Sequence, residues 1–507
     1  MRRLLSCSGL LLIAVGGAAA PISPDAAAPP QPSPTAQQRS EAFQYAEQVT
    51  LLAHEIERYY VRPVEQADLI HAALAGLYET VRHPIPSSLR AEIDRAKKDG
   101  GQLRELVELR ELVARHRLAL GDPEPLRGPG ALLASARGMM RVLDPHSGII
   151  TGEELRRGSG ADSRPNFGLE VELGSNPPHR ILSVHPGGPA QRAGVRPGDE
   201  MLLLEGKLLL SEMLLRGNQP FKNTAITADA GAELTLTIRR ASSKEPWKVK
   251  LRAENFKPET VFGVVRQDDH AWDYWLDRQR KIAHVRLGGL EEGSAEELRQ
   301  VVRRLQESGL RGLLLDLRWC PGGYLSEALG VAEIFLGECT IATVKSRVQG
   351  GDTYRSVKDD GKVLDIPIVV LVNAETSGGA ELIAAALQDN GRAVVAGQRT
   401  RGKASIQTTH GLPIPNTGLK LTTGTFYRPS GKNLHRFPDS KPGDDWGVRP
   451  ESKLEFRISA ELNRQLKDWW QLQTLRPGPS REVLPLDDPK ADPQRYAALQ
   501  ALAGLLR

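Results

Sequence analysis

The stretch from Ile368 to Gln407 constrains the fold of this chain more than any other. Ile368 to Val372 is an unbroken apolar run, which is typical of a parallel strand that is buried on both faces. Turn residues follow, and the Ala- and Leu-rich run from Ala380 to Asp389 has helical spacing up to a stop at Asn390-Gly391. A second strand begins at Ala393. The stretch therefore predicts a βαβ unit, whose chemistry should lie at the carboxyl ends of the strands.

A similar pattern occurs upstream, where a buried strand is predicted over Leu313 to Leu317 and a helix over Leu325 to Phe335. The loop between them contains Gly322 and Gly323. Because parallel strands end at the same edge of a sheet, we expect this loop to face the turn that carries Ser377. Glycines there let backbone N–H groups approach a ligand, as an oxyanion hole requires.

Charge and composition exclude several classes of function. Lys and Arg number 67 against 62 Asp and Glu, so the net charge is only +5, and no basic stripe indicates nucleic acid as a partner. No residue cluster has metal-ligand spacing, and no P-loop follows the glycine-rich turn, so no cofactor is expected. Two of the three cysteines, Cys320 and Cys339, lie far from the N-terminus, and the sequence leaves open whether they pair or stay free.

The N-terminus has the features of an export signal. Arg2 and Arg3 precede an apolar run from Leu10 to Val15 and the small residues Ala18 to Ala20. The apolar run is too short to span a membrane. A Pro-rich segment then predicts a flexible tether. We therefore expect an exported protein of the periplasm or cell envelope, for which a peripheral contact with the membrane stays open.

Helices are expected next. Apolar residues recur at intervals of three and four from Glu41 to Glu79, and again from Leu106 to Val113, which predicts a helical region that packs or dimerises. The segment 82–126 has no assigned role. His146, next to an aspartate and a proline, is interpreted as a turn residue rather than a ligand.

From Asn166 the pattern changes to short alternating strands and turns. Pro189-Ala190, Ala193-Gly194-Val195 and Pro197-Gly198-Asp199 resemble the turn, short helix and turn of a PDZ domain. The resemblance implies that Phe167-Gly168-Leu169 is its carboxylate-binding loop. In such a loop backbone N–H groups bind a peptide's terminal carboxylate, and an exposed strand edge pairs with the peptide. A β-domain that acts only as a spacer is the alternative.

Taken in order, the motifs resemble the carboxy-terminal processing (tail-specific) serine peptidases. The segments that carry the resemblance are LDPHS, the PDZ-like region, LLLDLRWCPGG, VLVNAETSGGAELIAAALQDNGRAVVAGQRTRGKASIQ, KLTTGTFYRPSGK and WGVRPE. It implies a multidomain α/β protein with a crotonase-like αβ core that cleaves protein or peptide substrates bound by their C-termini. The expected domains are a signal peptide (1–20), a tether (21–40), an N-terminal helical region (41–160), a PDZ domain (161–255), a peptidase core (256–455) and a C-terminal helical tail (456–507).

The same resemblance implies a catalytic site of serine and lysine. Burial lowers a lysine's pKa, and a neutral amine can then take the proton of a nearby hydroxyl. The implied roles are Ser377 as nucleophile, Lys403 as general base, Gln407 as the residue that orients it, and the backbone of Gly322, Gly323 and Gly378 as the oxyanion hole.

The nucleophile is where the sequence departs from the family. The family places its attacking serine three residues before the glutamate that corresponds to Glu381, and here that position is Gly378. In one interpretation the glycine-rich turn lets Ser377 swing into the site. In the other the nucleophile is lost, and the protein is a catalytically silent binder of C-termini. The sequence leaves both interpretations open, together with the substrate and the oligomeric state.

Overall fold

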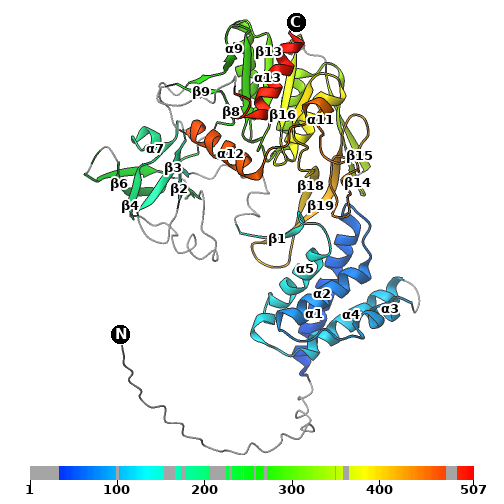
Figure 1. The fold of residues 1–507 in the computed structure, drawn as a ribbon. Helices are drawn as coiled ribbons and strands as arrows, with labels where there is room; N and C mark the ends of the chain where they lie inside the picture. Colours follow the sequence, from blue (N-terminus) through cyan, green and yellow to red (C-terminus); the bar gives the residue numbers. More distant parts are fainter. Residues whose placement is uncertain are drawn as a thin grey trace, which may run out of the picture.

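The computed structural model shows a mixed α/β protein of several parts (Figure 1). The signal peptide and most of the tether, predicted over residues 1–40, lie outside the described residues. The residues that the structure describes are 34–98, 102–152, 166–172, 178–185, 187–205, 224–227, 231–240, 243, 245–255, 259–267, 271–348, 350–357, 365–475 and 488–506.

A parallel sheet forms the centre of the largest part. Its four parallel strands, in spatial order, are β12 (Ile282–Leu287), β13 (Gly312–Asp316), β16 (Ile368–Val372) and β17 (Val394–Gly397). Two short strands pair antiparallel with β12, namely β8 (Val261–Phe262) and β11 (Trp275–Asp277). All residues of β12, β13 and β16 are buried, because layers cover the sheet on both faces.

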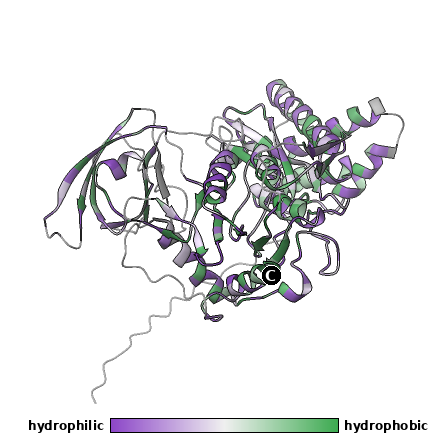
Figure 2. Ribbon diagram, turned by 90° about the horizontal axis from the view of Figure 1, so that it is seen from above, coloured by the Kyte–Doolittle hydropathy of each residue, from purple (hydrophilic) through white to green (hydrophobic). Residues whose placement is uncertain are grey.

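Alternate residues of these strands point into two different cores. One core is shared with α9 (Ser294–Glu307), α10 (Leu325–Phe335) and α11 (Gly379–Asp389). The other is shared with α13 (Pro493–Leu505), the red helix of Figure 1. In Figure 2 the helices carry both hydrophilic (purple) and hydrophobic (green) residues along their length. The C-terminal residues are therefore one layer of the α/β unit.

A buried ion pair attaches α13 to the sheet. Asp492, the N-cap of α13, accepts two hydrogen bonds of 2.9 Å from the guanidinium of Arg318. Arg318 also binds Asp316, at the end of β13. These three side chains are almost fully buried, so each charge depends on its partners.

A second, antiparallel sheet connects the α/β unit to the N-terminal helices. It contains β1 (Gly148–Thr151), β14 (Cys339–Ser346), β15 (Gly350–Ser356), β18 (Ser405–Gly411) and β19 (Thr417–Tyr427). The side chains of Leu419 and Leu421 enter the helical core. The remaining short elements here are β9 (Val265–Arg266), β10 (Trp272–Asp273) and η2 (Ser452–Leu454).

The helical region contains α1 (Ala36–Tyr59), α2 (Gln66–Thr80), α3 (Leu89–Lys98), α4 (Gln102–Ala119), η1 (Glu124–Leu126) and α5 (Gly130–Arg141). The continuous pattern from Glu41 to Glu79 is thus two helices. They are separated at Pro63, which lacks an N–H and disfavours helix in the residue before it. The unassigned segment 82–126 supplies α3 and α4, which contact each other and pack against α1 and α2.

The third part, at the left of Figure 1, is a six-stranded antiparallel sheet with one short helix. Its elements are β2 (Asn166–Glu172), β3 (His179–Val184), α7 (Pro189–Arg192), β4 (Glu200–Glu205), β5 (Thr224–Thr227), β6 (Glu233–Arg239) and β7 (Trp247–Arg252), in the spatial order β5-β2-β3-β4-β6-β7. Helix α12 (Ala460–Leu475) contacts both β3 of this module and β9 of the α/β unit.

Two further observations concern single features. Cys320 is buried and Cys339 is partly buried, and neither forms a disulfide. Among the residues that the structure describes, no helix has the length and apolar character to cross a membrane.

A candidate active site at the carboxyl edge of the parallel sheet

The glycine loop after β13 and the turn after β16 are in direct contact, as expected from neighbouring parallel strands. The backbone N–H of Ser377 donates to the carbonyl of Cys320 at 3.0 Å. A Cβ atom placed on Gly322 would lie only 2.8 Å from the carbonyl oxygen of Ser377. Only glycine therefore fits at position 322.

Ser377, the predicted nucleophile, is hydrogen-bonded to the loop after β13 and not to the predicted base. Its side chain is buried, with 1% exposed, and its hydroxyl donates to the carbonyl of Pro321 at 2.9 Å. It makes no hydrogen bond to Lys403. The Ser377 hydroxyl thus lies in the contact between the turn after β16 and the glycine loop after β13.

Gly378 occupies the sharp bend between strand and helix. Its backbone has φ +61° and ψ −128°, a conformation that residues with a side chain rarely adopt. A Cβ atom here would lie 3.3 Å from the carbonyl oxygen of Pro321 and 3.9 Å from that of Lys403. A strained strand-to-helix turn of this kind presents the nucleophile in α/β-hydrolases. Geometry and sequence spacing therefore both indicate position 378 as the place for a nucleophile.

Lys403 lies beside this bend, in the loop between β17 and β18. Its backbone carbonyl accepts the N–H of Gly378 at 3.1 Å. Partial burial lowers the pKa of its amine, and the charges of Lys420 and Arg401 lower it further. Its amine has no hydrogen-bond or ion-pair partner among the described residues. Such an amine is suited to accept a proton.

Glu381 holds the two segments together, a role that the sequence analysis missed. One carboxylate oxygen accepts the N–H of Gly378 at 3.1 Å. The other accepts the N–H of Gly402 at 2.6 Å and the hydroxyl of Thr400 at 2.5 Å. Complete burial raises the pKa of Glu381 to about 7, although these hydrogen bonds oppose the shift. A carboxylate flanked by apolar residues in the first turn of the helix was the available signal.

Gln407 does not contact the amine that it was predicted to orient. Its amide donates to the hydroxyl of Ser405 at 2.8 Å and more weakly to Thr422 at 3.4 Å. Because its amide points along the sheet, the structure gives no hydrogen bond through which Gln407 could orient Lys403.

Two histidines lie near Lys403 instead. The rings of His146 and His435 meet edge to face, with centroids 5.8 Å apart. Burial, followed by the charge of His146, lowers the pKa of His435 to about 4. Burial also lowers the pKa of His146, and the Lys403 charge adds to this effect. His146 does lie in the predicted turn, where its N–H donates to Asp144. Its place beside the lysine depends on tertiary contacts that the sequence does not display.

The predicted oxyanion donors differ in their availability. The N–H of Gly378 is already bound to Lys403 and Glu381, so this part of the prediction is corrected. Burial raises the pKa of the Cys320 thiol, and the nearby backbone of Gly322 opposes this shift. Within the described part of the chain, the N–H groups of Gly323 and Gly379 have no acceptor. Gly379, which was not among the predicted oxyanion donors, follows the bend directly and is the second available donor.

The predicted peptide-binding residues lie inside the six-stranded module. Phe167 and Leu169 are fully buried in its core. The N–H of Gly168 donates to the side chain of Asn166 at 2.8 Å. Strand β2, which carries them, pairs with β5 as well as with β3, so β2 is an inner strand of this sheet.

Comparison with known proteins identifies the family. Residues 281–443 match the model of peptidase family S41. The carboxy-terminal-processing protease of Bartonella bacilliformis is 31% identical over 305 residues, which cover 59% of this chain and 65% of that protein. Residues 281–443 therefore form a peptidase family S41 region within this chain. The resemblance seen in the motifs is confirmed.

Other S41 relatives are similar over comparable lengths. The carboxyl-terminal-processing protease of a Picosynechococcus species is 26% identical over 342 residues, 64% of this chain and 78% of that protein. Its Synechocystis counterpart is 28% identical over 340 residues, 65% of this chain and 73% of that protein. A solved structure, the photosystem II D1 C-terminal processing protease, has 22% identity and a TM-score of 0.41, covering 83% of this chain and 93% of that one.

The S41 match covers the candidate site but not the whole molecule. It extends from β12 into the polar loops after β19, and so includes the bend at Gly378 and the lysine loop. The N-terminal helices, the six-stranded module and α13 lie outside it. The chain spans just under two thirds of the Bartonella relative.

Proposed function

We propose that this chain is a serine-type endopeptidase of the C-terminal processing kind, which acts on protein substrates near their C-termini. The observation that carries the proposal is Lys403, a partly buried amine without a partner among the described residues, held beside the strand-to-helix bend. The named S41 relatives, which are processing proteases, support it. The free N–H groups of Gly323 and Gly379 would bind the oxyanion.

In this mechanism Ser377 is the nucleophile. Its hydroxyl must leave the carbonyl of Pro321 and approach the Lys403 amine. The two glycines that follow it permit this backbone rotation, because neither has a side chain that restricts φ and ψ. Lys403 then takes the hydroxyl proton as the oxygen attacks the substrate carbonyl.

A second candidate function is favoured by the geometry of Gly378. The backbone at this position already has the bend that presents a nucleophile, yet the residue has no side chain, and Ser377 is bound elsewhere. The alternative is a catalytically silent S41 protein that binds C-terminal ends without cutting them.

One set of variants separates the two candidates. Purified protein is incubated with peptides that have apolar C-termini, with binding followed by fluorescence anisotropy and cleavage by mass spectrometry. If Ser377 is the nucleophile, the wild type cleaves, and both Ser377→Ala and Lys403→Ala abolish cleavage. Cleavage that persists after both substitutions would contradict the Ser377 mechanism. Wild-type cleavage that depends on Lys403 would rule out the silent binder.

The sharper test of the silent binder is Gly378→Ser. The site has room for a Cβ if the Pro321 carbonyl yields by a few tenths of an ångström, although this backbone conformation strains serine by roughly 1–3 kcal/mol. We expect this variant to gain Lys403-dependent cleavage. Gly391→Ser is the matched control, because Gly391 also has a positive φ but nothing within 4 Å of its Cβ position. No gain in a folded Gly378→Ser variant contradicts the assignment of position 378.

Finer features belong to the same proposal. The six-stranded module would be a PDZ domain, and the α/β unit a crotonase-like core. The leader at 1–20 would direct export to the periplasm or cell envelope, where protein C-termini are the substrates and the membrane surface a peripheral contact. The motif order in the sequence supports these features. N-terminal sequencing of the protein from its native cells tests the export: a start near Pro21 is expected, and an intact Met1 leader would contradict it.

A further inference from the structure

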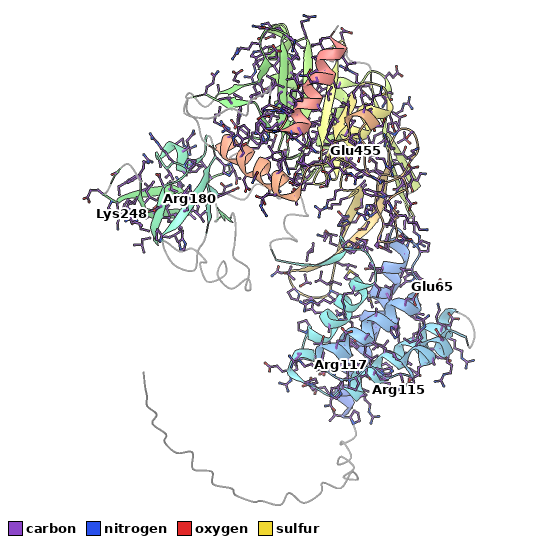
Figure 3. All side chains as sticks on the ribbon, viewed as in Figure 1. Glu65, Arg115, Arg117, Arg180, Lys248 and Glu455 are labelled. Carbon is purple, nitrogen blue, oxygen red and sulfur yellow. The ribbon has the colours of Figure 1, made fainter. Side chains whose placement is uncertain are left out.

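A pocket rich in arginine lies behind the loop that carries Lys403. Its volume is about 420 Å³. Its lining includes five arginines and one aromatic ring, namely Arg399, Arg401, Arg436, Arg449, Arg457 and Trp446. Glu455, labelled in Figure 3, marks its position at the α/β unit. Gly402 forms the partition between pocket and site, since a Cβ there would lie 2.7 Å from the Cβ of Arg436 and 3.0 Å from the Trp446 ring.

Most of the positive charge in this pocket is not paired with a carboxylate. Within the described residues, no carboxylate forms an ion pair with Arg399, Arg401, Arg436 or Arg449. The fifth arginine, Arg457, approaches Glu455 at 3.3 Å. The pocket therefore concentrates positive charge, although the net charge of the whole chain is only +5.

Two of these arginines are fixed by groups that satisfy hydrogen bonds without neutralising charge. Arg399 donates to the carbonyls of Pro442, Asp444 and Trp446 at 2.7–3.1 Å. Arg449 also donates to the carbonyl of Pro442, at 2.8 Å. Backbone carbonyls carry no formal charge, so these hydrogen bonds do not neutralise the positive charges of Arg399 and Arg449.

The aromatic ring of Trp446 also restricts the positions of two guanidinium groups. The guanidinium carbon of Arg399 lies 3.3 Å from the ring centroid, and that of Arg436 lies 4.6 Å away. Burial, followed by repulsion from Arg449 and Arg436, lowers the pKa of Arg399 to about 10, against the opposing charges of Asp445 and Glu455. The guanidinium groups are thus held in place before any ligand arrives, which reduces the entropy lost on binding.

We propose that this pocket is a binding site for a small, multiply charged phosphate-type oxyanion, such as pyrophosphate. Its volume is in the range of small-molecule sites, and arginine forks match phosphate oxygens in bidentate geometry. Arg401 and Arg436, both exposed and with side chains that make no hydrogen bond to described residues, are the groups that would contact the anion. Arg399 and Arg449 would supply charge from fixed positions.

The site would also influence the neighbouring lysine. Arg401 is one of the charges that lower the pKa of Lys403. A bound anion would cancel that effect, so the amine would hold its proton more tightly. This consequence rests on the proposed role of Lys403 in proton transfer, whereas the binding itself does not.

The binding test uses titration calorimetry of the full-length protein with pyrophosphate, at a fixed ionic strength of about 0.15 M, because screening weakens such contacts. The double variant Arg401→Gln/Arg436→Gln should bind at least about tenfold more weakly. Arg311→Gln is the matched control: this exposed arginine precedes β13, at the opposite edge of the sheet from the pocket. It should bind as the wild type does. Urea unfolding establishes that all variants are folded.

Three results would overturn the proposal. They are the absence of saturable pyrophosphate binding, equal weakening in the double variant and in Arg311→Gln, and tighter binding of hexaglutamate than of pyrophosphate, which would indicate an acidic peptide instead. Citrate serves as a further probe, and it should bind more weakly than pyrophosphate. Because the readout is heat of binding, the result is independent of whether the protein cleaves peptides.

Discussion

At the scale of single residues, the serine of the candidate site lies one position before the residue whose backbone forms the bend. Gly378 has the backbone conformation that presents a nucleophile, while the hydroxyl belongs to Ser377 and is bound to a carbonyl. Neighbouring residues at a helix start differ in direction by roughly 100°, so adjacency along the chain does not bring the hydroxyl to Lys403. The amine and two backbone N–H groups are in place, and the position of one oxygen separates the two candidate functions.

Glu381 allows a prediction at the same scale. Its pKa of about 7 exceeds the ordinary glutamate value of 4.5. Between these pH values the glutamate is ionised in the unfolded chain but still protonated in the folded one. The free energy of unfolding should therefore fall by up to about 3 kcal/mol as the pH rises, and level off above pH 7. Glu381→Gln cannot ionise and should lack this decline. Urea unfolding across this pH range measures the difference.

The control for this prediction is Glu307→Gln, at an exposed position on α9. Its stability should follow the same pH dependence as the wild type. Parallel curves for wild type and Glu381→Gln would show that the buried carboxyl does not hold its proton as described.

At the scale of elements, α13 closes one face of the parallel sheet. Leu502 is fully buried against β13, with its side chain 3.3 Å from the Cβ position of Gly312. We expect Leu502→Ala to lower the free energy of unfolding by about 2–5 kcal/mol, because it removes apolar contacts and leaves a cavity. The midpoint of urea unfolding measures this loss.

Leu505 on the same helix is the matched control, with 51% of its surface exposed. Leu505→Ala should change stability by no more than about 0.5 kcal/mol. Equal effects of the two substitutions would mean that α13 does not form the second layer of the sheet.

At the scale of the whole molecule, the two N-terminal parts are attached differently. The helical region shares a core with β19 through Leu419 and Leu421, so it cannot be removed without exposing apolar surface. The six-stranded module has a core of its own. Its first and last strands meet where Asn166 and Glu254 exchange backbone hydrogen bonds of 3.0 and 3.3 Å.

We therefore predict that the module can be excised. Replacing residues 166–254 by a short Gly-Ser linker should leave the remaining chain folded, with its thermal unfolding midpoint within a few degrees of the corresponding wild-type transition. The contrasting deletion, which removes residues 34–147, should yield insoluble protein. Aggregation of the excised variant would show that the α/β unit depends on the module.

The sequence alone determined most of the α/β unit. Strand Ile368–Val372 and helix Leu325–Phe335 were predicted to the residue, because uninterrupted apolar runs and helical spacing are local properties. It also indicated the peptidase family, because the motifs of that family occur in this chain in the same order. Lys403 and the glycine loop could be named for the same reason.

Only the tertiary structure decided which groups meet. The sequence could not show that Ser377 donates to Pro321, that Gly378 binds Lys403 through its backbone, or that β5 pairs with β2. Each depends on the direction of a bond or on pairing between distant segments, which spacing along the chain does not encode. The arginine pocket has the same origin, because loops from three separate segments bring together charges that are dispersed in the sequence.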